Sequence, residues 1–384
     1  MSQLLVSRPT LTKILSAIIL SCMTGLYSCS SQTSTPETQP TKTQQQNDDN
    51  LIFFDVTLEQ ADEVGRPIWN VKAKRAVYTK DKQIGRVDNP YGELYQDGKV
   101  VYQIRAERAD IKQDAKQLFL KGKIIATDPK NGVVLRGNEL EWKPQEDLLI
   151  VRNQLNGNHK QLKATAKEAR VKNRSQIIDF SGGVVANSVD PALQIRTQHL
   201  TWQIKQDKLA TDRTVQIDRY KNKKITVRGR GNSAEVYLKT KIARITQNAQ
   251  IQLLEPPMDI TSQAMTWNLN TEKVSSNSPI RVFQKTENVT VTGERGELKI
   301  PQKIVSLTGN VNAIGQRRQS LSSQRLTWFL DKKSIEARGN VLYKQVKPLL
   351  TFNGDTAVGN LQTENIVVSG GNTGKRVVTE IIPQ

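Results

Sequence analysis

Cysteine and histidine are scarce in this sequence of 384 residues, and their scarcity excludes several kinds of chemistry. The two cysteines, Cys22 and Cys29, lie near the N-terminus, so the rest of the chain holds no disulfide and no thiol nucleophile. The two histidines, His159 and His199, do not have the spacing of metal ligands. Glycine-rich phosphate loops are missing as well. We therefore expect a protein without a metal, a cofactor or a catalytic site.

Long apolar runs are missing too. The run from Ile14 to Leu20 is shorter than the ~20 apolar residues of a membrane-spanning helix. Lys13 precedes it and small residues follow it, which is the pattern of a secretory signal peptide. The next stretch, Leu26-Tyr27-Ser28-Cys29, resembles the box of bacterial lipoproteins, in which the cysteine carries the lipid. Two alternatives stay open, namely lipidation at Cys22 and an uncleaved signal anchor.

These features divide the chain into five parts. We expect a lipoprotein-type signal peptide (1–28), a disordered tether (29–50), a first β domain (51–190), continuing β repeats (191–378) and a tail (379–384). The tether is predicted because Ser, Thr, Gln, Pro and Asn dominate it and apolar side chains are almost absent. Sustained helical periodicity occurs nowhere in the body, and Asp55 to Glu63 is its best candidate for a helix.

The body shows a repeating strand pattern instead. Tyr102, Ile104 and Ala106 alternate with polar residues, which is the period-two signature of a half-buried strand. The next inward position, Ala109, is shifted by one residue, as a β-bulge would shift it. After a polar turn, a second alternating run is interrupted at Gly122. The pattern predicts a unit of two strands, each bent once.

The same unit recurs along the chain. Taking Ile111 as its anchor, apolar or small residues lie nine, seven, five and two positions before it, and these offsets recur at the other anchors. The ten anchors are Tyr78, Ile111, Trp142, Val171, Trp202, Val236, Trp267, Leu298, Trp328 and Gly359. In five units a glycine follows eleven residues after the anchor. A period of about 31 residues is typical of repeat proteins, in which each unit buries its apolar face on its neighbours. We therefore predict an all-β stack of about ten two-strand repeats.

Four anchors are tryptophans, and they admit two interpretations. Large aromatic side chains on an apolar strand face commonly form a packed core. Alternatively, small residues such as Ala166 and Gly293 leave a continuous apolar slot between two sheets, which would suit acyl chains. The residues that would line this slot are Trp69, Val71, Ile104, Leu120, Leu140, Trp142, Ala166, Leu200, Trp202, Trp267, Gly293 and Trp328.

The formal net charge is +19, and the Lys and Arg residues are spread along the chain without forming one run. One interpretation is a solvated outer face that keeps a long sheet soluble and protects its edges. The other is attraction to an anionic membrane surface or glycolipid. No nucleic-acid motif is present, so we expect no nucleic-acid partner.

Two stretches resemble the LptC family, the membrane-attached periplasmic component of lipopolysaccharide export. They are Gly65-Arg66-Pro67-Ile68-Trp69-Asn70-Val71-Lys72-Ala73 with the following Ala76 and Tyr78, and Tyr91-Gly92-Glu93-Leu94-Tyr95 with Tyr102-Gln103-Ile104-Arg105-Ala106. The likeness is best over residues 51–190, and the later units are similar to the OstA-like repeat of the family's bridge proteins. The resemblance implies an elongated β-jellyroll (β-taco) that is open along one side. The chain is about twice as long as the familiar short members and looks like a long, cyanobacterial-type member.

The resemblance also implies a function and partners. The protein would accept lipopolysaccharide from an inner-membrane ABC transporter and pass it along a β-jellyroll bridge toward the outer membrane. The transporter would meet the first edge, near Trp69–Tyr78, and a bridge protein of like fold the last edge, near Leu349–Ser369. The protein would be periplasmic, held at the inner membrane by an N-terminal lipid or an uncleaved signal anchor. Two alternatives stay open: a carbohydrate-active enzyme on a repetitive β scaffold, and a structural envelope protein with a packed core.

Overall fold

The computed structural model describes residues 50–78, 84–112, 116–363, 365–370 and 378–381. The predicted signal peptide, Cys29 with its predicted lipid, and the predicted tether up to residue 49 lie outside these ranges. The described residues form antiparallel strands and two 3-10 turns, and they contain no α-helix. No helix in this part of the chain is long and apolar enough to span a bilayer. The prediction of an all-β fold is confirmed.

The elements follow in chain order. The first half contains β1 (Leu51–Ala61), β2 (Pro67–Tyr78), β3 (Ile84–Asp88), β4 (Tyr91–Gln96), β5 (Lys99–Arg105), β6 (Arg108–Lys112), β7 (Leu118–Thr127), β8 (Val134–Lys143), η1 (Pro144–Glu146), β9 (Leu148–Asn158), β10 (Leu162–Lys172), β11 (Ile177–Ser188), β12 (Leu193–Gln203) and η2 (Ile204–Gln206). The second half contains β13 (Lys208–Thr211), β14 (Val215–Lys221), β15 (Lys224–Gly231), β16 (Ser233–Tyr237), β17 (Ile242–Leu253), β18 (Met258–Asn268), β19 (Lys273–Ser276), β20 (Ile280–Gln284), β21 (Val289–Gly293), β22 (Arg295–Lys299), β23 (Ile304–Ile314), β24 (Ser320–Phe329), β25 (Ser334–Gln345), β26 (Leu350–Asn360), β27 (Asn365–Ser369) and β28 (Val378–Ile381).

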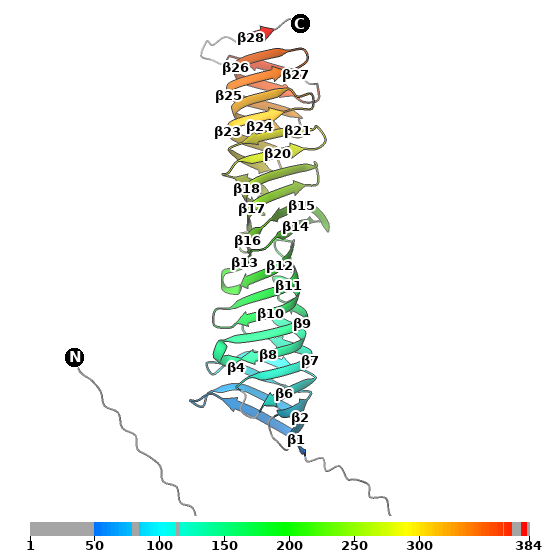
Figure 1. Ribbon diagram of the computed structural model, residues 1–384, viewed down its shortest axis with the longest axis vertical. Coiled ribbons are helices and arrows are strands. Elements are labelled where there is room, and N and C mark those ends of the chain that lie inside the picture. The colour runs from blue at the N-terminus through cyan, green and yellow to red at the C-terminus, as the bar shows by residue number, and fades with distance from the viewer. Residues whose placement is uncertain (1–49, 79–83, 113–115, 364, 371–377, 382–384) are drawn as a thin grey trace, which may run out of the picture. The chain divides into compact units, whose positions relative to one another are not determined.

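The strands form one continuous antiparallel sheet, in which each pass of the chain pairs with the pass before it and the pass after it. Several passes are interrupted midway and count as two strands, as β5 and β6 or β13 and β14 do. Figure 1 shows the strands stacked in chain order from β1 to β28. The first strand of each predicted unit ends at the anchor or one residue after it; β10, for example, ends one residue after Val171. The repeat read from the sequence is therefore the repeat of the structure.

Each pass of the chain bends near its middle. The pairing of β7 with β8 shifts register between Lys121 and Ile124, and Gly122 lies between them with a φ of 77°. Gly182 occupies the equivalent place in β11 with a φ of 85°, a conformation that residues with a Cβ rarely adopt. A Cβ added at Gly182 would also lie 2.7 Å from the Cβ of Lys167, on the bend of the preceding strand. The predicted bulges and their glycines therefore form the bends.

The bends turn the two halves of each pass into two layers that face each other. Trp142, in the second half of β8, donates a hydrogen bond from Nε1 to the carbonyl oxygen of Ile68, in the first half of β2 (3.0 Å). A single apolar cluster lies between the layers and runs from Ile68 to Ala357. Every unit thus buries its apolar face against its neighbours, and the stack can grow beyond the size of one compact core.

The predicted helix at Asp55 to Glu63 is wrong. Residues 51–61 form β1, which pairs with β2 in the register that places Phe53 opposite Ala76. Val56 and Leu58 pack against the core from this strand. Pairing with the edge of the sheet and burial of two apolar side chains outweigh the local preference of this segment for a helix.

The two edges also differ from the prediction. Trp69–Tyr78 is covered by β1, so β1 is the first edge. At the other end, β27 covers one half of β26 and β28 covers the other, pairing Leu350 with Ile381. The last edge therefore includes β27, inside the predicted range Leu349–Ser369, and β28, which lies largely in the segment expected to be a tail.

Candidate functional site

The tryptophan anchors lie between the two layers, near the ends of β8, β12, β18 and β24. Trp142, Trp202, Trp267 and Trp328 are at most 2% exposed. Side chains alternate between the two faces of each of these strands, and the tryptophan lies on the inward face. A turn follows soon after each tryptophan. The structure therefore places these rings inside the stack and next to one of its long margins.

The predicted slot residues all face this interior. All of them are buried except Ala166, which is half-buried and packs against the same cluster. The space beside the small residues is filled: a Cβ added at Gly293 would lie 3.2 Å from the Cβ of Leu307 and 3.5 Å from Val311. A void near Gly296, between Ile260 and Leu307, measures only about 10 Å³. In this closed state the layers touch, and a lipid could enter only if they moved apart.

The ends of the strands form two margins, which we call the anchor rim and the return rim. The anchor rim consists of the described parts of the turns that follow the anchors: 116–117, 144–147, 173–176, 204–207, 238–241, 269–272, 300–303, 330–333 and 361–363. The return rim consists of the turns that lead into the next unit: 62–66, 97–98, 128–133, 159–161, 189–192, 222–223, 254–257, 285–288, 315–319 and 346–349. The line along which the two rims meet is called the seam.

Polar side chains join the two rims along most of the seam. The contacts are Glu63 with Lys116 (2.7 Å), Asp97 with Arg174 (2.7 Å), Asn131 with Gln176 (3.5 Å), Gln161 with Asp207 (3.1 Å), Asp190 with Lys241 (3.0 Å), Lys221 with Glu272 (3.7 Å) and Glu287 with Lys333 (3.1 Å). In each pair one residue lies in or beside a return-rim turn and the other in or beside an anchor-rim turn of a later unit. The rims are therefore staggered, and each contact spans more than one unit.

These contacts are weak individually. The ion-paired side chains are partly exposed to solvent, for example 51% for Arg174 and 50% for Asp97. Exposed ion pairs contribute about 0–1 kcal/mol each, because water competes for both charges. Main-chain hydrogen bonds, in contrast, join neighbouring strands within each layer. None of these strand pairings among the described residues crosses the seam. The seam is consequently the line along which the stack is easiest to open.

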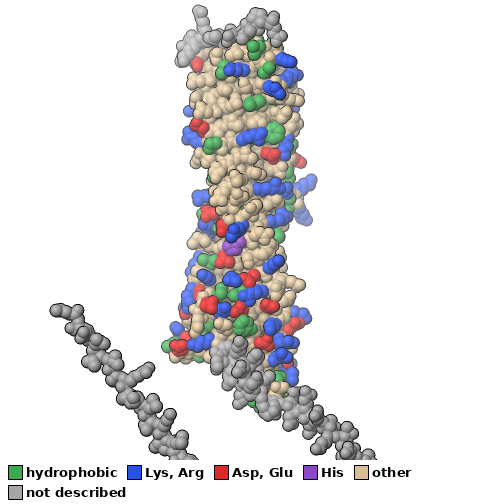
Figure 2. All heavy atoms as spheres, viewed as in Figure 1, with side chains coloured by type: hydrophobic (Ala, Val, Ile, Leu, Met, Phe, Trp, Pro, Cys, Tyr) green, Lys and Arg blue, Asp and Glu red, His purple; other side chains and the backbone are tan. Residues whose placement is uncertain are grey.

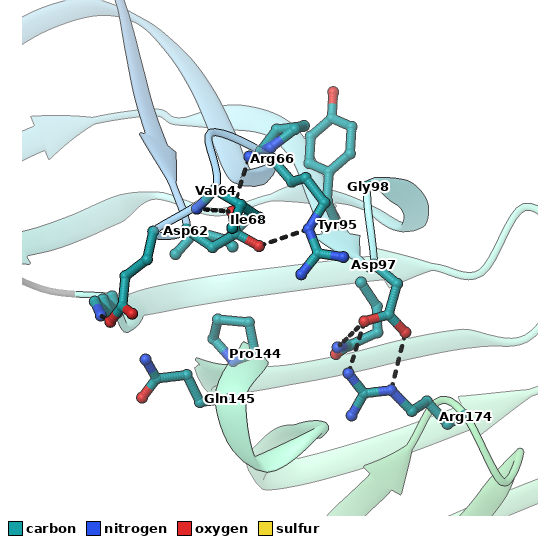
Figure 3. Close-up of a pocket in the computed structure, with 14 residues that line it drawn as sticks. Asp62, Val64, Arg66, Ile68, Tyr95, Asp97, Gly98, Pro144, Gln145 and Arg174 are labelled. Atoms are coloured by element: carbon teal, nitrogen blue, oxygen red, sulfur yellow. Dashed lines mark hydrogen bonds and ion pairs between the residues drawn. The ribbon is translucent and has the colours of Figure 1, made fainter.

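A polar pocket of about 320 Å³ lies at the start of the seam (Figure 3). Asp62 and Arg66 form one pair on its return-rim side (2.8 Å), and Asp97 and Arg174 form a second pair at its edge. The hydrogen bond from Arg174 lowers the pKa of Asp97 to about 2. Because the basic groups of this pocket are matched by carboxylates, it does not concentrate charge of one sign.

A second opening, of about 100 Å³, lies between turn 315–319 and the start of β27. Its walls are apolar on both sides, with Val289, Leu321 and Tyr343 on one layer and Ile335 and Ile366 on the other. Apolar residues from both layers thus reach the seam near the last units.

The outer faces carry the charge predicted for them. Figure 2 shows Lys and Arg side chains along the whole length of the face in view, interspersed with Asp and Glu. Ion pairs here tie neighbouring strands: Asp218 accepts hydrogen bonds from Arg196 (2.6 Å) and Arg228 (2.7 Å). Burial would raise the pKa of Asp218, but the hydrogen bonds from Arg228, Gln216 and Arg196 outweigh it and leave the pKa below its usual value. The charged side chains are therefore spread over the outer face, and some of them form ion pairs between neighbouring strands. Within the described ranges, no cluster of three His, Cys, Asp or Glu could hold a metal ion.

Comparison with protein families identifies the family to which the chain belongs. The model of the family described as lipopolysaccharide-assembly, LptC-related, matches three successive stretches, 16–149, 134–254 and 280–375. The chain belongs to this family. It is therefore a component of lipopolysaccharide transport, and its family consists of transport proteins and not of enzymes. Members of the LptC family are in general associated with the periplasm and the inner membrane. No curated protein matches the chain.

The resemblance to the LptC family is best over residues 51–190 when single motifs are compared. The three matches show that it continues along the body. The alternative of a carbohydrate-active enzyme is accordingly set aside. The seam contacts of this LptC-related protein were not foreseen from the sequence. The only signal for them was the presence of charged residues in the turns of successive units, without any indication of which turns would meet.

Proposed function

We propose that this protein accepts lipopolysaccharide from an inner-membrane ABC transporter and passes it along its interior toward a bridge protein of like fold. The observation that carries the proposal is the single apolar interior, which runs from Ile68 to Ala357 beneath a seam of weak polar contacts. Acyl chains would lie between the layers, and the polar part of the lipid would project between the rims. The slot residues predicted from the sequence are the residues that would touch the chains.

The ends of the stack supply the partners in this proposal. The edge strand β1 pairs only with β2 in the described chain, and its Phe54 is 71% exposed. Added strands at open edges use main-chain hydrogen bonds, which is a common mode of recognition. We assign the transporter to β1 and the bridge protein to β27 and β28. A lipid on Cys29 would hold the first edge near the inner membrane.

Photo-crosslinking tests this function. A photoreactive amino acid at Trp202, which faces the interior, should form an adduct with lipopolysaccharide in cells. The control is Lys163, which lies on the outer face of β10 and is exposed. Adducts at both positions in equal yield, or at neither, would contradict transport through the interior.

A further inference from the structure

The indole N–H groups of the tryptophan anchors have different partners. Trp142 donates its hydrogen bond to the carbonyl oxygen of Ile68 across the interior (3.0 Å). Trp202 and Trp267 are 2% and 1% exposed, yet within the part of the chain that the structure describes no atom accepts a hydrogen bond from either Nε1. Buried polar groups without a partner are rare and costly, so these two donors call for an explanation. Nε1 of Trp69, which is not an anchor, also lacks an acceptor among the described residues.

The ring of His159 contacts that of Trp202 but does not accept its hydrogen bond. The ring of His159 lies 5.1 Å from that of Trp202, but its Nδ1 accepts a hydrogen bond from the backbone N–H of Gln161 (3.2 Å). A second hydrogen bond joins His159 to the backbone of Asn131. Both ring nitrogens of His159 therefore already form hydrogen bonds with the backbone of return-rim residues.

Trp267 is buried, and the benzene part of its ring lies in apolar surroundings. Its ring lies beside Gly229 of β15, where an added Cβ would be 3.7 Å from Cζ3. Gly229 has no side chain to offer, and Ile245 and Ile251 occupy the space next to it. This edge of the Trp267 ring, around Cζ3, is therefore next to apolar groups.

Both donors lie at the boundary between the apolar interior and the polar seam. Trp202 is the penultimate residue of β12, and the contact between Gln161 and Asp207 lies in the adjoining turns. Trp267 is the penultimate residue of β18, and Glu272, in the turn that follows, contacts Lys221. An amphiphile with its chains in the interior would hold its acyl carbonyl groups at this same level, where the chains join the polar part. Tryptophan suits such a boundary because its ring is apolar and its N–H is polar.

We propose that Trp202 and Trp267 donate hydrogen bonds to the acyl carbonyl oxygens of the bound lipid. This inference rests on the proposed function and names the ligand chemistry: chains attached through an ester or amide, not through an ether. The two N–H groups fix how deep the lipid lies and favour the loaded state, because a carbonyl acceptor relieves the cost of two unpaired donors.

The replacement of tryptophan by phenylalanine isolates the N–H. Trp202→Phe and Trp267→Phe should leave the Tm of the free protein unchanged or raise it, because no hydrogen bond is lost. Each should weaken binding of an acylated lipid by about five- to tenfold, the value of one hydrogen bond. The matched control for stability is Trp142→Phe, which should lower the Tm because the Ile68 carbonyl loses its donor. If Trp202→Phe and Trp267→Phe lower the Tm as much as Trp142→Phe does, these donors are satisfied in the free protein and the inference is wrong.

Two probes complete the test by calorimetric titration. They are 1-myristoyl-lysophosphatidylcholine, with an ester carbonyl, and its 1-O-tetradecyl ether analogue, with equal chain and headgroup. The wild-type protein should bind the ester about tenfold or more tightly than the ether, and the Trp202→Phe/Trp267→Phe double variant should lose this preference. Equal binding of both probes by the wild type, or an unchanged preference in the double variant, would overturn the inference and leave the proposed function standing. A wild-type protein that binds neither probe nor purified lipopolysaccharide would reject the proposed function itself.

Discussion

Arg174 donates two hydrogen bonds to Asp97, from Nε (2.9 Å) and from Nη2 (2.7 Å), although 77 residues separate the two in the chain. Asp97 lies on the return rim and Arg174 on the anchor rim, so this bidentate pair closes the seam beside the polar pocket at its start. Its geometry makes it the most specific of the contacts that hold the rims together.

The Asp97–Arg174 pair should make stability depend on acid. The pKa of Asp97 is lowered to about 2 from a usual 3.8, so the pair stabilises the folded protein above about pH 4 and loses this effect as the pH falls toward 2. Because both groups are half exposed, we expect no more than about 1 kcal/mol. Thermal melts from pH 5 to pH 2 should show that Asp97→Asn lowers the Tm at pH 5 and not at pH 2. A constant difference across this range would mean that the carboxylate charge is irrelevant.

Closing the seam permanently should block lipid loading. In a variant with Cys22 and Cys29 replaced by Ser, Gln161→Cys and Asp207→Cys can be joined by a short bismaleimide, because their side chains meet across the seam (3.1 Å). The cross-linked protein should take up much less lipopolysaccharide, since its layers cannot part at this point of the seam.

The matched control for the cross-link joins two anchor-rim residues. Lys303→Cys and Asp331→Cys replace an ion pair of 2.7 Å whose partners lie on the same rim. This cross-link should leave loading unchanged. Equal inhibition by both cross-links would show that stiffening, and not closure of the seam, affects loading.

A bulky side chain inside the stack should obstruct transfer. Ala166 is half-buried in β10 and packs against the core, so Ala166→Trp adds volume where the chains would lie. We expect transfer to fall strongly and stability to fall by about 1–3 kcal/mol, the usual cost of overpacking. Lys163→Trp, on the outer face of the same strand, serves as the control. Complete unfolding of Ala166→Trp, seen by circular dichroism, would favour the purely packed core.

The two edges should bind different partners. Val367→Pro interrupts β27, and Phe54→Pro interrupts β1; because a terminal strand touches only one neighbour, the rest of the stack should stay folded. In pull-down experiments Val367→Pro should lose the bridge protein and keep the transporter, and Phe54→Pro should do the opposite. Retention of both partners by both variants would place the junctions elsewhere.

Removal of the predicted lipid should release the protein. Cys29→Ala is expected to shift the body from the membrane to the soluble fraction or to stop its processing, whereas Cys22→Ala should have no effect. Mass spectrometry of the membrane-bound protein provides the decisive measurement, since an intact Met1 would show an uncleaved anchor.

The sequence predicts the repeat well because the repeat is local. Alternation and the one-residue shift at Ala106 to Ala109 depend only on which side chains point inward, and they locate strands and bends directly. The strand β1 was misread as a helix because its conformation depends on pairing with β2, and no pattern within residues 55–63 indicates that partner.

The seam could not be predicted, since each of its contacts joins turns from different units. Gln161 and Asp207 are 46 residues apart, and their meeting depends on how the layers close and on the stagger between them. The filled space beside Gly293 could not be predicted either, because the residues that fill it, Leu307 and Val311, belong to a different strand. Small residues therefore indicated room that side chains from other strands occupy.

The bends at Gly122, Gly182 and their equivalents lie midway along each pass, on the side of the stack opposite the seam. They can act as hinges, because rotation there moves the rims apart without breaking the main-chain hydrogen bonds that join neighbouring strands within each layer. The hinges and the seam contacts are spread along the stack, so the stack need not open along its whole length at once. A lipid could advance within a short open stretch that forms ahead of it and closes behind it. The number of seam contacts broken at any moment, and with it the barrier to movement, would then be independent of how many repeats the protein contains.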